Sequence, residues 1–127
     1  MKKYKLLFVD DDRNLSKIMK IQLEKKGFEV QIAETAPQAK TALSRAIPDV
    51  MVVDLKMPVW NGIDLIKMVR RRERFNDVTI VALTGFDSPD KKEKAISAGA
   101  NLYLCKPITP EQLALKIRNF LETKSKK

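Results

Sequence analysis

The sequence predicts an α/β fold: a doubly wound, five-stranded parallel sheet with the strand order 2-1-3-4-5. Five short apolar runs alternate with five helical patterns, which is typical of βαβ units with right-handed crossovers. The chain has 127 residues, 44% of them hydrophobic, which suits one domain with its own core. The first, third and fourth runs are almost wholly apolar, so we expect them at the centre of the sheet, buried on both faces.

The predicted strands are short and differ in polarity. They cover Leu6–Val9, Glu29–Ala33, Val50–Val53, Val78–Leu83 and Leu102–Cys105. Gln31 interrupts the second run, and the fifth run is amphipathic, so both fit the edges of the sheet. In this order the first and third strands are neighbours, and the connectivity changes direction between them. Ligands of such folds bind outside the strand ends at that point.

The first three predicted helices carry apolar side chains at helical spacing. The stripes are Leu15, Ile18, Met19 and Leu23 for the first helix; Ala39, Ala42, Leu43, Ala46 and Ile47 for the second; and Leu65, Ile66 and Val69 for the third. Gly27 suits a left-handed cap after the first helix. Pro37 opens the second helix, which we expect to end before Pro48.

The last two predicted helices differ in the strength of their apolar faces. The fourth, between Ser88 and Ala98, has a thin stripe, and we expect it to be the least firmly held helix. The fifth begins with the capping box Thr109-Pro110-Glu111-Gln112, in which threonine caps the helix and glutamine follows three residues later. Its predicted buried face consists of Leu113, Ile117, Phe120 and Leu121.

Polar residues stand at the ends of four of the predicted strands. They are Asp10, Asp11, Asp54, Thr84 and Lys106. Because the carboxyl ends of parallel strands lie along one edge of a sheet, we expect these side chains to meet in one pocket. Three carboxylates, a hydroxyl and an ammonium can bind a divalent cation and accept a phosphoryl group.

The acidic residues predict a metal site. Carboxylates held close together repel one another, and a bound cation relieves that repulsion. Oxygen ligands suit Mg²⁺, for which Mn²⁺ can substitute. We expect Asp11 and Asp54 to be direct ligands, the backbone carbonyl of Lys56 to be the third ligand, and Asp10 to act through water.

Asp54 is also the candidate nucleophile for phosphoryl transfer. A carboxylate can attack phosphorus and form an acyl phosphate while the metal offsets the charge of the incoming group. Lys106 offers an ammonium and Thr84 a hydroxyl to the remaining phosphoryl oxygens.

Composition excludes several classes of function. The chain has no histidine and one cysteine, which excludes Ser-His-Asp and Cys-His catalysis and disfavours a zinc site. Its net charge is +9, but the basic residues are spread over several segments and accompany no nucleic-acid-binding motif, so we expect solvated helix faces and no direct nucleic-acid binding. Without an apolar span or a secretory signal, we expect a cytoplasmic protein that does not insert into membranes.

Four segments, in chain order, resemble the motifs of the receiver domain of two-component response regulators. They are Phe8-Val9-Asp10-Asp11, Asp54-Leu55-Lys56-Met57-Pro58 with Asn61-Gly62 following, Leu83-Thr84-Gly85, and Lys106-Pro107. The resemblance covers almost the whole chain. Within the family, the chain is similar to single-domain regulators of the chemotaxis or phosphorelay type. It implies the flavodoxin-like (βα)5 receiver fold. It also implies a signalling switch that catalyses only the phosphorylation of its own aspartate and is otherwise not an enzyme.

The resemblance further implies roles for individual residues. Asp54 is the phosphoacceptor, which receives its phosphoryl group from a histidine kinase or a histidine phosphotransfer domain. Thr84 and Tyr103 are the switch residues, whose movement alters the face formed by the fourth helix, the fifth strand and the fifth helix. The Lys106–Pro107 peptide bond is expected to be cis. Lys56 and Phe86 occupy positions that affect phosphoryl lifetime in the family, and their size predicts slow self-dephosphorylation.

Several alternatives stay open at this point. We expect a receiver domain over residues 1–123 and a basic polar tail over 124–127, as a free-standing regulator with an unknown downstream target. The chain can instead be the receiver part of a larger response regulator or hybrid kinase, with a DNA-binding or enzymatic output domain. A receiver-like interaction module that takes no phosphate is the third alternative. For the oligomeric state, we expect a monomer or a phosphorylation-dependent dimer. A haloacid-dehalogenase-type phosphatase is excluded because Lys56 stands where its second aspartate is needed.

Overall fold

The computed structural model describes residues 3–57, 60–85 and 88–125, and it confirms the predicted architecture. The strands are β1 (Tyr4–Val9), β2 (Phe28–Ala33), β3 (Val50–Asp54), β4 (Thr79–Thr84) and β5 (Leu102–Cys105). The helices are α1 (Arg13–Lys25), α2 (Ala36–Arg45), α3 (Gly62–Arg70), α4 (Pro89–Ala98) and α5 (Pro110–Ser125), with a short 3-10 helix η1 (Glu73–Phe75) before β4. All paired strands are parallel, in the order β2-β1-β3-β4-β5.

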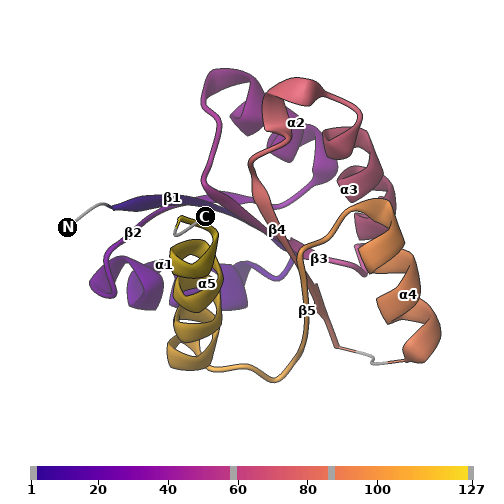
Figure 1. Ribbon diagram of the computed structural model, residues 1–127. Coiled ribbons are helices and arrows are strands. Elements are labelled where there is room, and N and C mark those ends of the chain that lie inside the picture. Colours follow the sequence, from indigo (N-terminus) through magenta and orange to yellow (C-terminus); the bar gives the residue numbers. More distant parts are fainter. Residues whose placement is uncertain (1–2, 58–59, 86–87, 126–127) are drawn as a thin grey trace.

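The helices form one layer on each face of the sheet (Figure 1). Successive residues of a strand point to opposite faces, so Leu7 and Val9 of β1 pack with α2, α3 and α4, whereas Leu6 and Phe8 pack with α1 and α5. Every residue of β3 and β4 is buried, while β2 exposes Glu29 and Gln31. This is the burial expected of two central strands and one edge strand. Among the described helices, none has the length and apolarity needed to span a membrane.

Side-chain caps begin the helices. The capping residues are Asp12 for α1, Thr35 for α2, Asn61 for α3, Ser88 for α4 and Thr109 for α5. The predicted capping box of α5 is present: the amide of Gln112 donates to Thr109 Oγ1 at 3.0 Å, and the amide of Thr109 donates to Gln112 Oε1 at 3.0 Å. Gly27 follows α1 with a φ of 93°, in the region that favours glycine.

Two isoleucines assigned to apolar stripes are exposed instead, and so is the one isoleucine of the thin stripe of the fourth helix. Ile18 of α1 is 56% exposed, Ile47 after α2 is 46% exposed, and Ile96 of α4 is 45% exposed. The second helix ends at Arg45, and its C-cap residue Ala46 has extended backbone angles and is exposed. The prediction that Ala46 and Ile47 extend the buried stripe of α2 is therefore wrong. The residue before a proline avoids helical angles, which accounts for the early end of this helix before Pro48.

Arg70 joins several elements at the amino edge of the sheet. Its guanidinium donates to the carbonyl oxygens of Gly99 at 2.9 Å, Phe75 at 2.9 Å and Val78 at 2.8 Å, and to Asn101 Oδ1 at 2.8 Å. Burial lowers the pKa of this guanidinium. Contrary to the expectation that the basic residues lie on solvated helix faces, the Arg70 side chain connects α3 with η1, with the start of β4 and with the end of α4.

Candidate functional site

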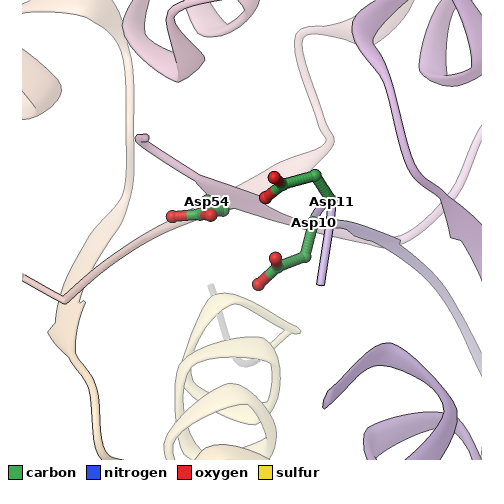
Figure 2. A group of neighbouring side chains, drawn as sticks. All are labelled: Asp10, Asp11 and Asp54. Atoms are coloured by element: carbon green, nitrogen blue, oxygen red, sulfur yellow. The ribbon is translucent and has the colours of Figure 1, made fainter. Parts of the chain in front are cut away.

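The register of the sheet brings the predicted acidic residues together. Val9 of β1 pairs with Val53 of β3, so Asp10 and Asp54 follow at the same level, and Asp11 comes next. One carboxylate oxygen from each of the three aspartates lies within 4.8 Å of the others. Figure 2 shows the three side chains gathered where β1 and β3 end. Asp10 and Asp54 are buried, whereas Asp11 is exposed, so the cluster can be reached from solvent through Asp11.

The turn after β1 fixes the position of Asp10. The amide of Asp10 donates to the carbonyl of Ala33 at 3.0 Å, and the amide of Asp12 donates to Asp10 Oδ1 at 2.9 Å. Ser16, buried in the first turns of α1, donates its hydroxyl to the carbonyl of Asp10 at 3.4 Å. The Asp12 carboxylate does not join the cluster but caps α1, accepting from the amide of Leu15 at 3.0 Å.

Lys106 reaches the acidic cluster from β5. Its amide donates to the carbonyl of Thr84 at 2.7 Å, which aligns the end of β5 with the end of β4. Its ammonium lies 3.0 Å from Asp10 Oδ2 and 3.7 Å from Asp54 Oδ2. The Lys106–Pro107 peptide bond is cis, as predicted. The ammonium therefore bridges two of the three carboxylates, those of Asp10 and Asp54.

Electrostatics at Asp54 are governed by burial. Its side chain is almost enclosed, with Asp54 as a whole 5% exposed. Burial, followed by the charge of Asp10, raises the pKa of Asp54 from 3.8 to about 6 against the opposing charge of Lys106. For Lys106 itself, burial lowers the pKa, but the hydrogen bond to Asp10 and the nearby carboxylates outweigh burial and raise it. An added cation would relieve the repulsion that burial leaves between Asp10 and Asp54.

The two predicted switch residues lie on neighbouring strands. Thr84 is the last residue of β4, is buried, and pairs with Cys105 of β5. Tyr103 pairs with Ala82, is half-buried, and packs against the core on the side of α3 and α4.

Gly62 is a site residue whose physical role sequence reasoning missed. It begins α3, and its amide donates to the carbonyl of Leu55 at 3.1 Å. A Cβ added to Gly62 would collide with the carbonyl oxygen of Asp54 and would lie 2.7 Å from the Cα of Leu55. The loop after β3 therefore returns directly against the backbone of Asp54. The Asn61-Gly62 pair signals a turn, but this close approach cannot be deduced from the pair alone.

The donor set fits a hard divalent cation. Three carboxylates contribute oxygen atoms from one small region, and such oxygen ligands are those that Mg²⁺ takes. The amide of Lys56 donates to Asp54 Oδ1 at 3.2 Å, so the backbone just past β3 lies beside the cluster. The carbonyl of Lys56 as a ligand stays a prediction. Pro58 of the second motif and Phe86, which is expected to affect phosphoryl lifetime, lie outside the described residues.

Comparison with known protein families identifies the family to which the chain belongs. Residues 6–118 match the response regulator receiver domain. The chain belongs to this family. The protein is thus a receiver domain of two-component signalling, a class of signalling switches rather than of enzymes acting on a separate substrate.

Relatives of this receiver domain include short and long proteins. Chemotaxis protein CheY1 of Helicobacter pylori is 37% identical over 121 residues, which cover 94% of this chain and 98% of CheY1. The phosphate regulon transcriptional regulatory protein PhoB of Pseudomonas aeruginosa is 30% identical over 116 residues, which cover 91% of this chain but 51% of PhoB.

Solved receiver structures share the whole fold. A CheY-like receiver domain protein from Methanospirillum hungatei superposes with a TM-score of 0.90 at 28% identity, covering 98% of both chains. Chemotaxis protein CheY4 of Vibrio cholerae superposes with a TM-score of 0.88 at 31% identity, covering 93% of this chain and 98% of that one. The predicted strand order and helix placement are those of this family.

Proposed function

We propose that this receiver domain is a phosphorylation-dependent switch that accepts a phosphoryl group on Asp54 with the help of Mg²⁺. The observation that carries the proposal is the enclosure of Asp54 between two carboxylates and the Lys106 ammonium, 3.7 Å from Asp54 Oδ2. A buried carboxylate in this setting has a nucleophilic oxygen, a cation for the incoming group, and partners for a metal.

The proposed transfer forms one bond and breaks another. A carboxylate oxygen of ionised Asp54 attacks phosphorus, and the bond from phosphorus to the donor breaks. The donor is the imidazole nitrogen of a phosphohistidine, on a histidine kinase or phosphotransfer domain, or the acetate oxygen of acetyl phosphate. The electron pair leaves with that nitrogen or oxygen. Mg²⁺ would be held by Asp11, Asp54 and the carbonyl of Lys56, with Asp10 acting through water. Its positive charge would offset the negative charge of the phosphoryl oxygens.

The proposed response starts at Thr84 and Lys106. The new phosphoryl oxygens accept hydrogen bonds from the Thr84 hydroxyl and the Lys106 ammonium, which draws Thr84 toward Asp54. The space that this movement opens between β4 and β5 is filled by Tyr103 turning inward. The population then shifts toward a second packing of the face formed by α4, β5 and α5. That face binds the downstream target.

The relatives support two candidate contexts for this switch, a free-standing regulator and part of a longer protein. The match to CheY1 over nearly its whole length supports a free-standing cytoplasmic regulator that docks on a partner protein or relays phosphate onward. The match to half of PhoB supports the second candidate, a receiver attached to an output domain. In both cases the domain binds no nucleic acid itself, and phosphorylation either leaves it monomeric or drives dimerisation.

Intact mass spectrometry tests the proposal. Acetyl phosphate with Mg²⁺ should add one phosphoryl mass to the wild-type chain and none to Asp54→Asn. The matched control is Asp64→Asn, which changes an exposed aspartate at the start of α3 and should be phosphorylated like wild type. Omission of Mg²⁺ should abolish the gain. No gain in wild type, or an equal gain in Asp54→Asn, would rule out Asp54 as the acceptor.

A further inference from the structure

A hollow between α2 and α3 lies outside the phosphorylation site. Its volume is about 210 Å³, and its apolar floor is formed by Leu43 of α2, Met68 and Val69 of α3, and Phe75 of η1. Leu43, Val69 and Phe75 are buried and Met68 is half-buried, so the floor is part of the packed core. The hollow lies toward the amino edge of the sheet, because η1 directly precedes β4.

The rim of this hollow is basic. Lys40, Arg72 and Arg74 line it together with the hydroxyl-bearing Ser44, and no carboxylate among the described residues does so. Described contacts leave these three cations without an acidic partner: Lys40 lies 4.6 Å from the ring centroid of Trp60, and Arg74 lies 5.0 Å from that of Phe75. Three unneutralised cations around an apolar floor favour an anion with an apolar body.

The size of the hollow limits the apolar body. An engineered apolar cavity of about 150 Å³ in another protein binds benzene, so this hollow accepts one ring or a short branched chain. The exposed large apolar side chains of the described residues lie elsewhere, at Ile18, Ile21, Ile47, Ile96 and Leu115. None of these five side chains lines the hollow. That arrangement suits a small ligand better than the broad apolar centre of a protein interface.

We propose that the hollow between α2 and α3 binds a small organic anion, namely a carboxylate carrying an aryl or branched alkyl group. The apolar group fills the space above Leu43, Val69 and Phe75, and the carboxylate accepts hydrogen bonds from the Arg72 and Arg74 guanidinium groups. Lys40 is drawn from the ring of Trp60 toward the same anion. This site is separate from Asp54, so ligand binding requires neither phosphorylation nor a divalent cation.

The single tryptophan provides a direct measurement. Titration of the full chain with 3-phenylpropionate, in EDTA and without phosphodonor, should change the emission of Trp60 saturably. The same titration should shift the methyl NMR signals of Leu43 and Val69. The uncharged amide, 3-phenylpropionamide, should bind about tenfold more weakly, because it lacks the charge that strengthens hydrogen bonds from arginine. Asp54→Asn should bind the acid like wild type, which separates this site from the proposed phosphorylation.

Matched variants complete the test. Arg72→Gln and Arg74→Gln should each weaken binding of 3-phenylpropionate about 5- to 10-fold. The control Arg71→Gln removes an exposed cation next to Arg72 that does not line the hollow, and it should leave the affinity within about twofold of wild type. Ser44→Leu, which fills the hollow from an exposed position, should abolish binding without unfolding the chain.

Three outcomes would overturn the proposal. The first is equal binding of acid and amide, and the second is equal weakening by Arg71→Gln and Arg72→Gln. The third is much tighter binding of an acidic peptide with one central phenylalanine than of 3-phenylpropionate, which would assign the hollow to a protein partner instead.

Discussion

Asp54 is held in a setting that opposes its own ionisation. It is buried beside Asp10, and the nearby Lys106 ammonium offsets only part of the cost. The burial that surrounds this proposed phosphoryl acceptor therefore lowers the stability of the metal-free protein at neutral pH. At this position chemistry and stability make opposite demands on one side chain.

Asp54→Asn should accordingly stabilise the metal-free protein at pH 7, by about 1–3 kcal/mol. The pKa of Asp54 is raised from 3.8 to about 6 in the folded state, so the folded state holds this proton more tightly than the unfolded state. The cost is absent below about pH 4, grows as pH rises, and is complete above about pH 6. Urea unfolding of both proteins between pH 4 and 7.5 measures this difference. A difference in unfolding free energy that stays constant across that pH range would contradict the raised pKa of Asp54. Added Mg²⁺ should make the difference between the two proteins smaller, because it stabilises only wild type.

Gly62→Ala should damage the site although it changes no polar group. The added methyl group collides with the carbonyl oxygen of Asp54, so the backbone that carries the proposed acceptor must shift. We expect a loss of about 1–3 kcal/mol of unfolding free energy together with slower phosphorylation by acetyl phosphate. Gly85→Ala is the matched control, because a Cβ there meets no heavy atom within 4 Å. If both variants unfold at the same urea concentration, the close approach at Gly62 carries no strain.

At the scale of elements, α4 buries very little apolar side-chain surface in the core. Its buried side chains are Ala95 and Ala98, and Ile96, the largest apolar side chain of the helix, is exposed. By contrast, α5 buries Leu113, Ile117 and Leu121. An element with so small a buried apolar surface can change its packing at low cost.

Amide hydrogen exchange should therefore be faster in α4 than in α5. The expected difference in protection is at least about tenfold, because opening α4 exposes little apolar surface. Exchange followed by mass spectrometry on fragments covering Pro89–Ala98 and Pro110–Ser125 measures it. Equal protection of the two helices would show that α4 is held by contacts other than its buried side chains, and would remove one support for movement of the face formed by α4, β5 and α5.

Helix patterns predicted which elements form but not every buried residue. The five helices were deduced from apolar spacing and caps, and the capping box of α5 was correct in both of its hydrogen bonds. Ile18 and Ile47 were wrong for different reasons. Ile18 lies on α1 at a position that no neighbouring element covers. Ile47 stands before Pro48, where the backbone leaves helical angles. Spacing along a helix records polarity, whereas burial depends on the partner that packs against it.

For the whole molecule, the parallel sheet was the strongest source of prediction. Because every strand ends at the same edge, the sequence placed Asp10, Asp11, Asp54 and Lys106 in one pocket, and the described contacts agree with that placement. Contacts that arise only from the course of loops could not be predicted. The approach of Gly62 to Asp54 and the hydrogen bonds of Arg70 depend on chain segments that return to the sheet from elsewhere.

Arg70→Met should be among the more destabilising substitutions in this protein. It leaves the carbonyl oxygens of Gly99, Phe75 and Val78 without their guanidinium donor, and we expect a loss of about 2–4 kcal/mol. Arg71→Met, at an exposed position next in the chain, should change stability by less than about 0.5 kcal/mol. Urea unfolding measures both. Similar stability of the two variants would mean that solvent replaces the contacts of Arg70.

The position of Arg70 has an evolutionary consequence. Its contacts lie at the amino edge of the sheet, and the acidic cluster lies at the carboxyl edge. Natural selection can therefore adapt the heat resistance of this protein at one edge and the chemistry of the acidic cluster at the other. Descendants in hot or cold environments can diverge around Arg70 and still keep the same acidic cluster.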